Sequence, residues 1–171
     1  MKIKSAESER HVLTVTVDNE PGILAKITGL FTARGYNIDS LTVADISDNH
    51  AISRITIVTN GPPQVIDQIE AQLDRLVPVH KVVDLTQAGP HVERELALVK
   101  VAGTGEKRVE ALRLADIFRA RPVDTTTESF VFEITGPPDK IDTFISLMRE
   151  LGLVEVGRTG IVGMMRGAEG A

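Results

Sequence analysis

Apolar and polar positions alternate in short runs along the chain, and stretches with helical spacing separate these runs. Residues 12–17 alternate with the period of a half-buried strand, and the apolar positions of residues 23–31 recur at helical spacing. The first half therefore predicts the order β-α-β-β-α-β. Its predicted elements are strand 12–17, helix 22–34, a hairpin of strands 38–46 and 52–59, a helix with the apolar stripe Ile66, Ile69, Leu73 and Leu76, and strand 79–85.

The second half repeats this order after a break at residues 87–90. Its predicted strands are 96–101, 122–125, 130–135 and 154–159, and its predicted helices are 106–119, with a less regular apolar stripe of Val109, Leu112 and Ile117, and one that ends at Leu151. Residues 61–67 match residues 136–142 at an offset of 75, and both stretches begin with Gly-Pro-Pro. A matched turn followed by matched core positions indicates two related modules.

We therefore predict an α+β fold of two tandem βαββαβ ferredoxin-like modules, each a sheet with two helices on one face. The predicted boundaries are a flexible N-terminal extension at 1–10, a first module at 11–86, a linker at 87–94, and a second module with a short flexible tail at 95–171. Modules this small bury only about 60% of their unfolded surface, so we expect dimerisation.

The composition narrows the function. The chain has 171 residues, a formal charge of −5 and no cysteine, which excludes disulfides, thiolate nucleophiles and cysteine-based zinc sites. Neither half carries a basic surplus, and the middle strands of the first module lack the aromatic residues of an RNA-binding sheet. The start has no apolar signal core, and no apolar run approaches the ~20 residues of a membrane helix. We expect a cytoplasmic protein with no nucleic-acid or membrane partner.

No pattern along the chain predicts catalysis. The sequence lacks nucleophile-elbow, zinc-protease and phosphate-loop motifs, and its carboxylates do not stand in apolar stretches that would shift their pKa. The segment His91-Val92-Glu93-Arg94-Glu95 could hold a metal in principle, but a spacing of two on a strand is a thin signal. We therefore expect no catalytic residue and no metal site.

The strand-to-helix turn Asp18-Asn19-Glu20-Pro21-Gly22-Ile23-Leu24 is the strongest candidate for binding. Pro21 suits the entry to a helix, and Gly22 lets a ligand approach the backbone. The free amide N–H groups of a helix N-terminus favour a small anion such as a carboxylate. Taken alone, the stretch also fits an ordinary capped turn, because short motifs often match by chance.

Asn37 is a second candidate, because it begins the second predicted strand. Asn19 and Asn37 lie at opposite ends of the helix between them, so one chain would struggle to bring both onto one small ligand. Two chains paired side by side could. This predicts a site shared across a dimer interface, in which amide N–H groups near Gly22 and Ile23 take a carboxylate and side-chain amides take an ammonium. An α-amino acid has both groups.

Six segments carry a resemblance to a known family. They are Asn19-Glu20-Pro21-Gly22-Ile23-Leu24, Arg34-Gly35-Tyr36-Asn37-Ile38-Asp39-Ser40-Leu41, Ser53-Arg54-Ile55-Thr56-Ile57, His91-Val92-Glu93-Arg94-Glu95, Ile117-Phe118-Arg119 and Arg158-Thr159-Gly160-Ile161-Val162. The chain resembles the small regulatory subunit of acetolactate synthase (acetohydroxyacid synthase), whose N-terminal module is an ACT domain. The resemblance covers roughly residues 11–167.

The resemblance implies a subunit with no intrinsic activity and no cofactor of its own. Such a subunit activates the catalytic subunit, which carries thiamine diphosphate, FAD and Mg²⁺. It also confers feedback inhibition by valine or another branched-chain amino acid, bound between the ACT domains of a homodimer. Carried over by position, the effector contacts are Asn19 and Gly22 from one chain and Asn37 from the other, with Ile23, Leu24 and Ile38 adjacent.

Two other classes of function stay open. One is a free-standing amino-acid sensor or transcriptional regulator, although the absence of a basic DNA-binding helix pair counts against it. The other is an enzyme with an unrecognised site.

Overall fold

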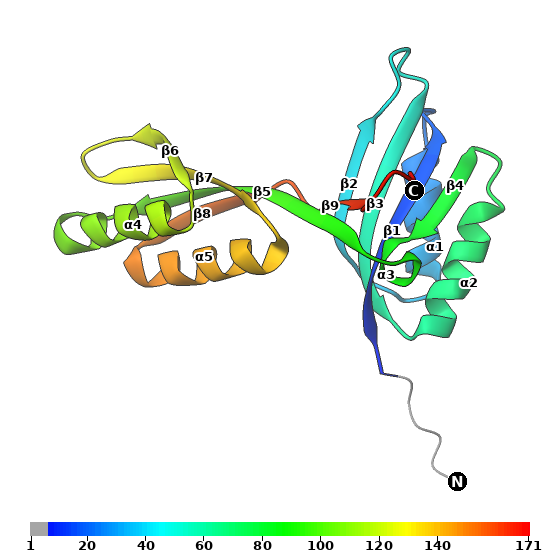
Figure 1. Ribbon diagram of the computed structural model, residues 1–171, viewed down its shortest axis with the longest axis horizontal. Coiled ribbons are helices and arrows are strands. Elements are labelled where there is room, and N and C mark those ends of the chain that lie inside the picture. Colours follow the sequence, from blue (N-terminus) through cyan, green and yellow to red (C-terminus); the bar gives the residue numbers. More distant parts are fainter. Residues whose placement is uncertain (1–6) are drawn as a thin grey trace, which may run out of the picture. The chain divides into compact units, whose positions relative to one another are not determined.

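The computed structural model describes residues 7–171, which form two compact units (Figure 1). Unit 1 contains the described residues up to Val92 together with residues 161–171, and unit 2 contains residues 93–160. Of the predicted N-terminal extension, residues 1–6 lie outside the described residues, whereas Glu9 and Arg10 already belong to the first strand. The predicted linker is also ordered structure, since a short helix covers residues 85–88 and a strand begins at His91.

Unit 1 has the predicted β-α-β-β-α-β order. Its elements are β1 (Glu9–Asp18), α1 (Ile23–Ala33), β2 (Ile38–Asp45), β3 (Ile52–Gly61), α2 (Pro63–Asp74), β4 (Val79–Asp84) and the short α3 (Leu85–Ala88). The four strands form an antiparallel sheet in the order β2-β3-β1-β4, with β2 and β4 at the edges. The predicted hairpin of the second and third strands is confirmed.

The core of unit 1 lies between the sheet and α1 and α2. Strand alternation turns one set of apolar side chains toward the helices, and the helical spacing of the two helices supplies the other set. The fully buried members are Leu13, Val15 and Val17 of β1, Ile55 and Ile57 of β3, Ile27 and Phe31 of α1, and Ile66, Ile69 and Leu73 of α2.

The opposite face of this sheet is covered by the end of the chain. Strand β9 (Val162–Met165) pairs with the beginning of β5, and the Arg166 amide donates a hydrogen bond to the Pro90 carbonyl. Ile161 is buried here against a second small apolar cluster of Val12, Val58 and Leu85. Residues 161–171, which we assigned to the second module and its tail, therefore belong to unit 1.

Unit 2 repeats the architecture of unit 1. Its elements are β5 (His91–Ala102), α4 (Gly105–Ile117), β6 (Arg121–Thr125), β7 (Ser129–Gly136), α5 (Pro138–Leu151) and β8 (Leu153–Arg158), and the sheet order is β6-β7-β5-β8. Positions matched by the offset of 75 are buried in both units, as Ile55 and Phe130 are, and Leu73 and Met148. The predicted pair of ferredoxin-like modules is confirmed.

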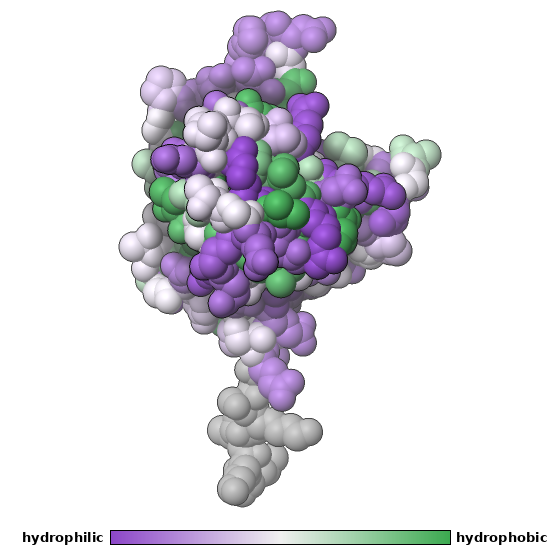
Figure 2. Space-filling model, turned by 90° about the vertical axis from the view of Figure 1, so that its left-hand side faces the viewer, coloured by the Kyte–Doolittle hydropathy of each residue, from purple (hydrophilic) through white to green (hydrophobic). Residues whose placement is uncertain are grey.

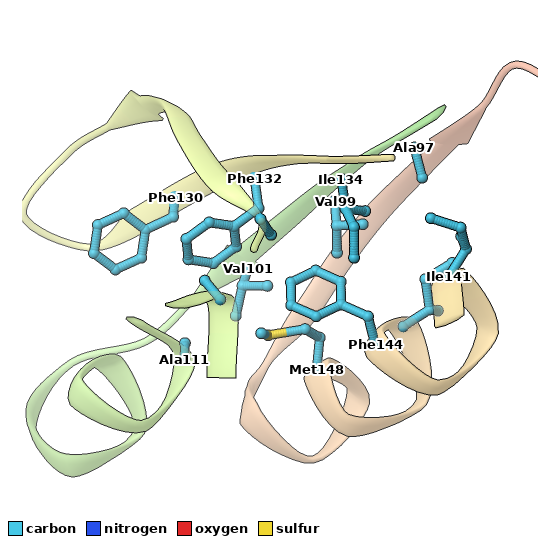
Figure 3. Close-up of a cluster of buried hydrophobic side chains, with 13 residues drawn as sticks. Ala97, Val99, Val101, Ala111, Phe130, Phe132, Ile134, Ile141, Phe144 and Met148 are labelled. Carbon is cyan, nitrogen blue, oxygen red and sulfur yellow. The ribbon is translucent and has the colours of Figure 1, made fainter. Parts of the chain in front are cut away.

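The core of unit 2 is built around three phenylalanines (Figure 3). Phe132 of β7 meets Phe144 of α5 edge to face with ring centroids 6.1 Å apart, and Phe130 lies beside Phe132 at 5.2 Å. Beyond α5, Gly152 adopts φ of 109°, and a Cβ there would lie 2.1 Å from the Ala102 carbonyl oxygen. Only glycine fits this junction between helix and strand.

The predicted apolar stripe of α4 is wrong. Val109 and Ile117 are 66% and 63% exposed and Leu112 is also exposed, whereas Ala111 and Ala115 face the core. The phenylalanines of β7 and α5 already fill this core, so α4 contributes small side chains that let the helix lie close to them. Figure 2, which faces unit 2, shows several small apolar patches, each bordered by hydrophilic residues.

An ion pair between Arg158 of β8 and the buried Glu95 of β5 links the two strands in unit 2. The guanidinium of Arg158 donates two hydrogen bonds to Glu95, at 2.8 and 2.7 Å, and one to Asp142 of α5 at 2.7 Å. Glu95 is almost completely buried, so its charge depends on Arg158 for compensation. These contacts raise the pKa of the Arg158 guanidinium above its ordinary value, chiefly through the hydrogen bonds to Glu95.

Candidate functional site

The turn between β1 and α1 presents backbone donors at the start of the helix. Gly22 lies directly before α1 with φ of 83°, a conformation that suits glycine. The helix begins at Ile23, one residue later than predicted, so Pro21 lies in the turn two residues before it. The sequence at this point therefore builds a tight turn that exposes the helix N-terminus.

Several amide N–H groups at this helix start have no acceptor among residues 7–171. The Ile23 amide donates a long hydrogen bond of 3.4 Å to the Glu20 carbonyl, whereas the amides of Gly22, Leu24 and Ala25 meet no acceptor in the described part of the chain. None of the side chains that the structure describes caps the helix, and the first helical turn holds no acidic residue. Free donors and the positive end of the helix dipole make this a suitable place for a carboxylate.

The side chain of Asn19 is fixed by the hairpin between β2 and β3. Its amide nitrogen donates a hydrogen bond of 2.9 Å to the His50 carbonyl, and its backbone amide donates one of 2.8 Å to the Ala51 carbonyl. Because the nitrogen is used, the side-chain oxygen of Asn19 is left as an acceptor. An acceptor close to exposed amide donors fits the two charged ends of an α-amino acid.

Asn37 is held at the other end of the sheet by a neighbouring carboxylate. Its amide nitrogen donates a hydrogen bond of 2.9 Å to Asp39, which also accepts one from Asn60. Its backbone carbonyl accepts a hydrogen bond of 2.6 Å from the Thr59 hydroxyl. The side-chain oxygen of Asn37 is therefore also left as an acceptor, and the residue is exposed.

Within one chain, Asn19 and Asn37 do not meet. Asp18 lies opposite Ile52 at the start of β3, whereas Ile38 lies opposite Thr59 near its end. Seven residues at a rise of ~3.3 Å separate these two rungs of the sheet by about 23 Å. A valine molecule is far shorter than this distance, so a site that uses both asparagines needs two chains.

The three remaining predicted site residues differ in what they can contribute. The Ile23 side chain is buried in the unit 1 core, so only its backbone faces the turn. Leu24 is 38% exposed next to the free amides. Ile38 is half-buried at the start of the edge strand. Leu24 and Ile38 can therefore offer apolar contact, and Ile23 cannot.

Two groups that orient the site were not predicted. The carbonyl of His50 directs Asn19 and the carboxylate of Asp39 directs Asn37. The sequence marked residues 47–50 only as a turn by composition, and the partner of Asn19 lies 31 residues away along the chain. The charged side chains nearby are paired at the surface, as Glu20 is with Lys26 at 3.7 Å.

The segment that could in principle hold a metal has other contacts. Glu95 pairs with Arg158, and His91 Nδ1 lies 3.0 Å from the Gly89 carbonyl. Among residues 7–171 no three His, Asp or Glu side chains come together in a way that could hold a metal ion. Within the same range, no helix is both long enough and apolar enough to cross a membrane.

Known proteins of one family match this chain over nearly its whole length. Residues 13–81 match the family model of the AHAS small subunit-like ACT domain, and residues 94–167 match that of the small subunit of acetolactate synthase. The chain is 46% identical to the probable acetolactate synthase small subunit of Archaeoglobus fulgidus, over 92% of this chain and 98% of that protein. It is 45% identical to the acetolactate synthase isozyme 3 small subunit of Escherichia coli, over 92% and 96%.

A solved structure agrees with these sequence matches. The crystal structure of the acetolactate synthase small subunit from Thermotoga maritima superposes with a TM-score of 0.83 at 38% identity, covering 94% of this chain and 99% of that chain. The matches to two family models, to similar sequences and to a solved structure agree. The chain therefore belongs to the acetolactate synthase small subunit family, and its first unit is an ACT domain.

Proposed function

We propose that the chain is the regulatory subunit of acetolactate synthase in the biosynthesis of valine, leucine and isoleucine. In this role it activates the catalytic subunit and makes it sensitive to feedback inhibition by valine or a related amino acid. The observation that carries the proposal is the orientation of Asn19, whose amide nitrogen is bound to the His50 carbonyl, so that an acceptor stands beside unpaired helix donors.

The proposed site forms when two chains pair along β2. This strand is an edge of the unit 1 sheet, so its outer hydrogen-bonding groups are available to a second chain. An antiparallel pairing about a two-fold axis sets the start of one β2 beside the end of the other. Asn37 of one chain then approaches the end of the sheet where Asn19 and Gly22 of its partner lie, and the separation of about 23 Å within one chain no longer matters.

In the proposed complex each end of the amino acid has its own partners. The carboxylate accepts hydrogen bonds from the free amides near Gly22 and Leu24. The ammonium donates to the side-chain oxygens of Asn19 and of the partner's Asn37. The aliphatic side chain lies against Leu24 and Ile38, which are the apolar residues at the surface there.

Regulation then follows from linkage between two binding events. An amino acid that bridges two chains stabilises one arrangement of the pair, and the catalytic subunit prefers a different arrangement. A coupling free energy of ~1–3 kcal/mol is enough for strong inhibition. The chain supplies no catalytic group and no cofactor in this scheme, and thiamine diphosphate, FAD and Mg²⁺ belong to the catalytic partner.

Mixed dimers test whether the site is shared. One chain carries Gly22→Asp and the other carries Asn37→Ala, with different affinity tags so that the heterodimer is isolated. A shared site places both lesions in one pocket and leaves the second pocket intact, so the heterodimer should bind one valine per dimer with wild-type affinity. A site within one chain would leave both pockets damaged, and the heterodimer would bind as poorly as either parent, which would refute the proposal.

The reconstituted enzyme supplies the second part of the test. The purified chain alone should convert no pyruvate, and adding it to the catalytic subunit should raise activity that valine then lowers. Assays with valine, leucine and isoleucine establish which amino acid is preferred. Activity of the chain alone would contradict the proposal, and so would a catalytic subunit that is neither activated nor inhibited in its presence.

A further inference from the structure

A groove of about 330 Å³ lies on the face of the unit 1 sheet that the helices do not cover. Its floor is formed by the end of β2 and the start of β3, and β9 forms its wall. Its lining includes the exposed apolar side chains Ile46, Val162 and Met164, of which Val162 and Met164 are 54% and 65% exposed. Exposed apolar side chains gathered around one hollow are typical of an interaction site.

The wall of this groove is held in place by the sheet itself. The Ile161 amide donates a hydrogen bond of 2.8 Å to the Ser40 hydroxyl, and the Ile161 carbonyl accepts one of 3.2 Å from the Thr42 hydroxyl. Gly163 packs so closely that an added Cβ would lie 2.6 Å from a methyl group of Leu85. The groove is therefore present before any partner binds, and a partner does not have to order it.

Arg54 supplies the groove with one positive charge, which has no carboxylate partner among residues 7–171. Its guanidinium donates a single long hydrogen bond of 3.4 Å to the Gly163 carbonyl. Among residues 7–171, no ion pair to Arg54 is recorded, in contrast to Arg158, which pairs with two carboxylates. A half-buried guanidinium with unused donors in an apolar hollow is suited to receive a carboxylate in a bidentate contact.

The shape and charge of the groove narrow the choice of occupant. Its rim side chains remain about half exposed, whereas a small-molecule site encloses most of its ligand, so a protein segment fits better. A second copy of this chain seated groove to groove about a two-fold axis would set Arg54 against its own counterpart, and like charges repel. A different protein with a carboxylate between apolar side chains meets both requirements.

We propose that this groove receives a segment of the catalytic subunit in which an Asp or Glu side chain is flanked by apolar residues. The carboxylate pairs with Arg54, and the apolar neighbours cover Ile46, Val162 and Met164. The inference rests on the proposed function, because it takes the catalytic subunit as the partner. It assigns a contact surface to the face of the sheet that carries β9, whereas the effector residues Asn19 and Gly22 lie in the turn that leads into α1 on the opposite face.

The test measures binding of the purified catalytic subunit by titration calorimetry, and activation in parallel. Arg54→Glu should weaken binding by about 100-fold and Arg54→Gln by about 10-fold, since truncation of a paired charge at an interface has effects of this size or larger. Met164→Ala should weaken binding several-fold. Arg75→Glu, which changes an exposed arginine after α2 away from the groove, is the control and should bind as the wild type does.

Two further measurements distinguish the possible outcomes. Each variant is checked for valine affinity and, by light scattering, for its oligomeric state, and both should be unchanged. Unaltered binding of Arg54→Glu would overturn the inference, and so would loss of the dimer, because the groove would then join two copies of this chain. If the wild type binds the catalytic subunit but does not activate it, the proposed activating function is wrong. The dissociation constants of the variants still decide whether the groove binds the catalytic subunit.

Discussion

The substitution Gly22→Asp tests where the carboxylate of the effector lies. Gly22 directly precedes α1, where the proposal places that carboxylate, so an aspartate there brings a second negative charge to the same donors. Two unit charges about 5 Å apart at an effective dielectric constant of ~20 repel by about 3 kcal/mol. This corresponds to roughly a hundredfold loss of valine affinity, since every ~1.4 kcal/mol is a factor of ten.

Any substitution at Gly22 also strains the backbone, and the effect of this strain has to be subtracted from the measured change in valine affinity. With φ of 83°, any other L residue is strained by about 1 kcal/mol, although an added Cβ would meet no atom within 4 Å among the described residues beyond its chain neighbours. Gly22→Ala therefore carries the strain without the charge, and Gly22→Asn carries the shape of aspartate without the charge. All three variants should melt a few degrees lower than the wild type.

Calorimetric titration of the isolated subunit with valine separates the effect of the charge from that of the backbone strain. Assays of the reconstituted enzyme then measure how each variant changes inhibition by valine. The alanine variant should bind valine within a few-fold of the wild type, and the aspartate variant should lose both binding and inhibition while it still activates. If alanine weakens valine binding as much as aspartate does, the charge argument is wrong. An aspartate variant with unchanged affinity would remove the carboxylate from this place altogether.

Two predictions concern stability. Burial raises the pKa of Glu70 above its ordinary value of 4.5, and Asp84 and Asp67 make smaller contributions. The folded state therefore loses stability as the pH rises from 4.5 through the raised pKa of the folded protein. Glu70→Gln should melt higher than the wild type at about pH 7 and at the same temperature at about pH 4, and thermal scans at both pH values test this. Arg158→Met leaves the buried Glu95 without its partner and should lower the free energy of unfolding, measured in urea, by roughly 2–3 kcal/mol. The loss is smaller than for a fully buried pair because Arg158 is partly exposed. A loss below about 1 kcal/mol would show that another group compensates the charge of Glu95.

Most of the regular elements could be predicted because they have a clear hydrophobic period. Alternation in β1 and β3 places Leu13 and Ile55 against the helices, and the stripe of α2 is buried at Ile66, Ile69 and Leu73. The opposite face of both strands is also buried, at Val12 and Val58, because the end of the chain covers it. Helix α4 has no such stripe, because its core positions are the alanines Ala111 and Ala115, and larger apolar residues lie at its surface. Apolar spacing identifies the buried face only when that face also carries the larger side chains.

The elements that could not be predicted depend on partners far along the chain. Strand β9 has four residues, and its place is set by contacts with Ser40, Thr42 and Leu85. The orientation of Asn19 similarly comes from the carbonyl of His50 in the next hairpin. The sequence predicted Asn19 and Asn37 as contacts for an amino acid, and the acceptor atoms left free on these side chains emerge only from the tertiary structure.

The edge strand β2 joins the features that matter most for the proposed regulation. It begins at Ile38, directly after the asparagine proposed to hold the effector of the partner chain. At its middle, Ser40 and Thr42 bind Ile161, which follows the end of β8 by only three residues. At its end lies the groove that contains Arg54. One strand of eight residues therefore contacts the proposed dimer site, the returning end of the chain and the proposed docking surface. In the proposed regulation, an amino acid that alters the pairing of β2 acts on the returning end of the chain through the hydrogen bonds of Ser40 and Thr42.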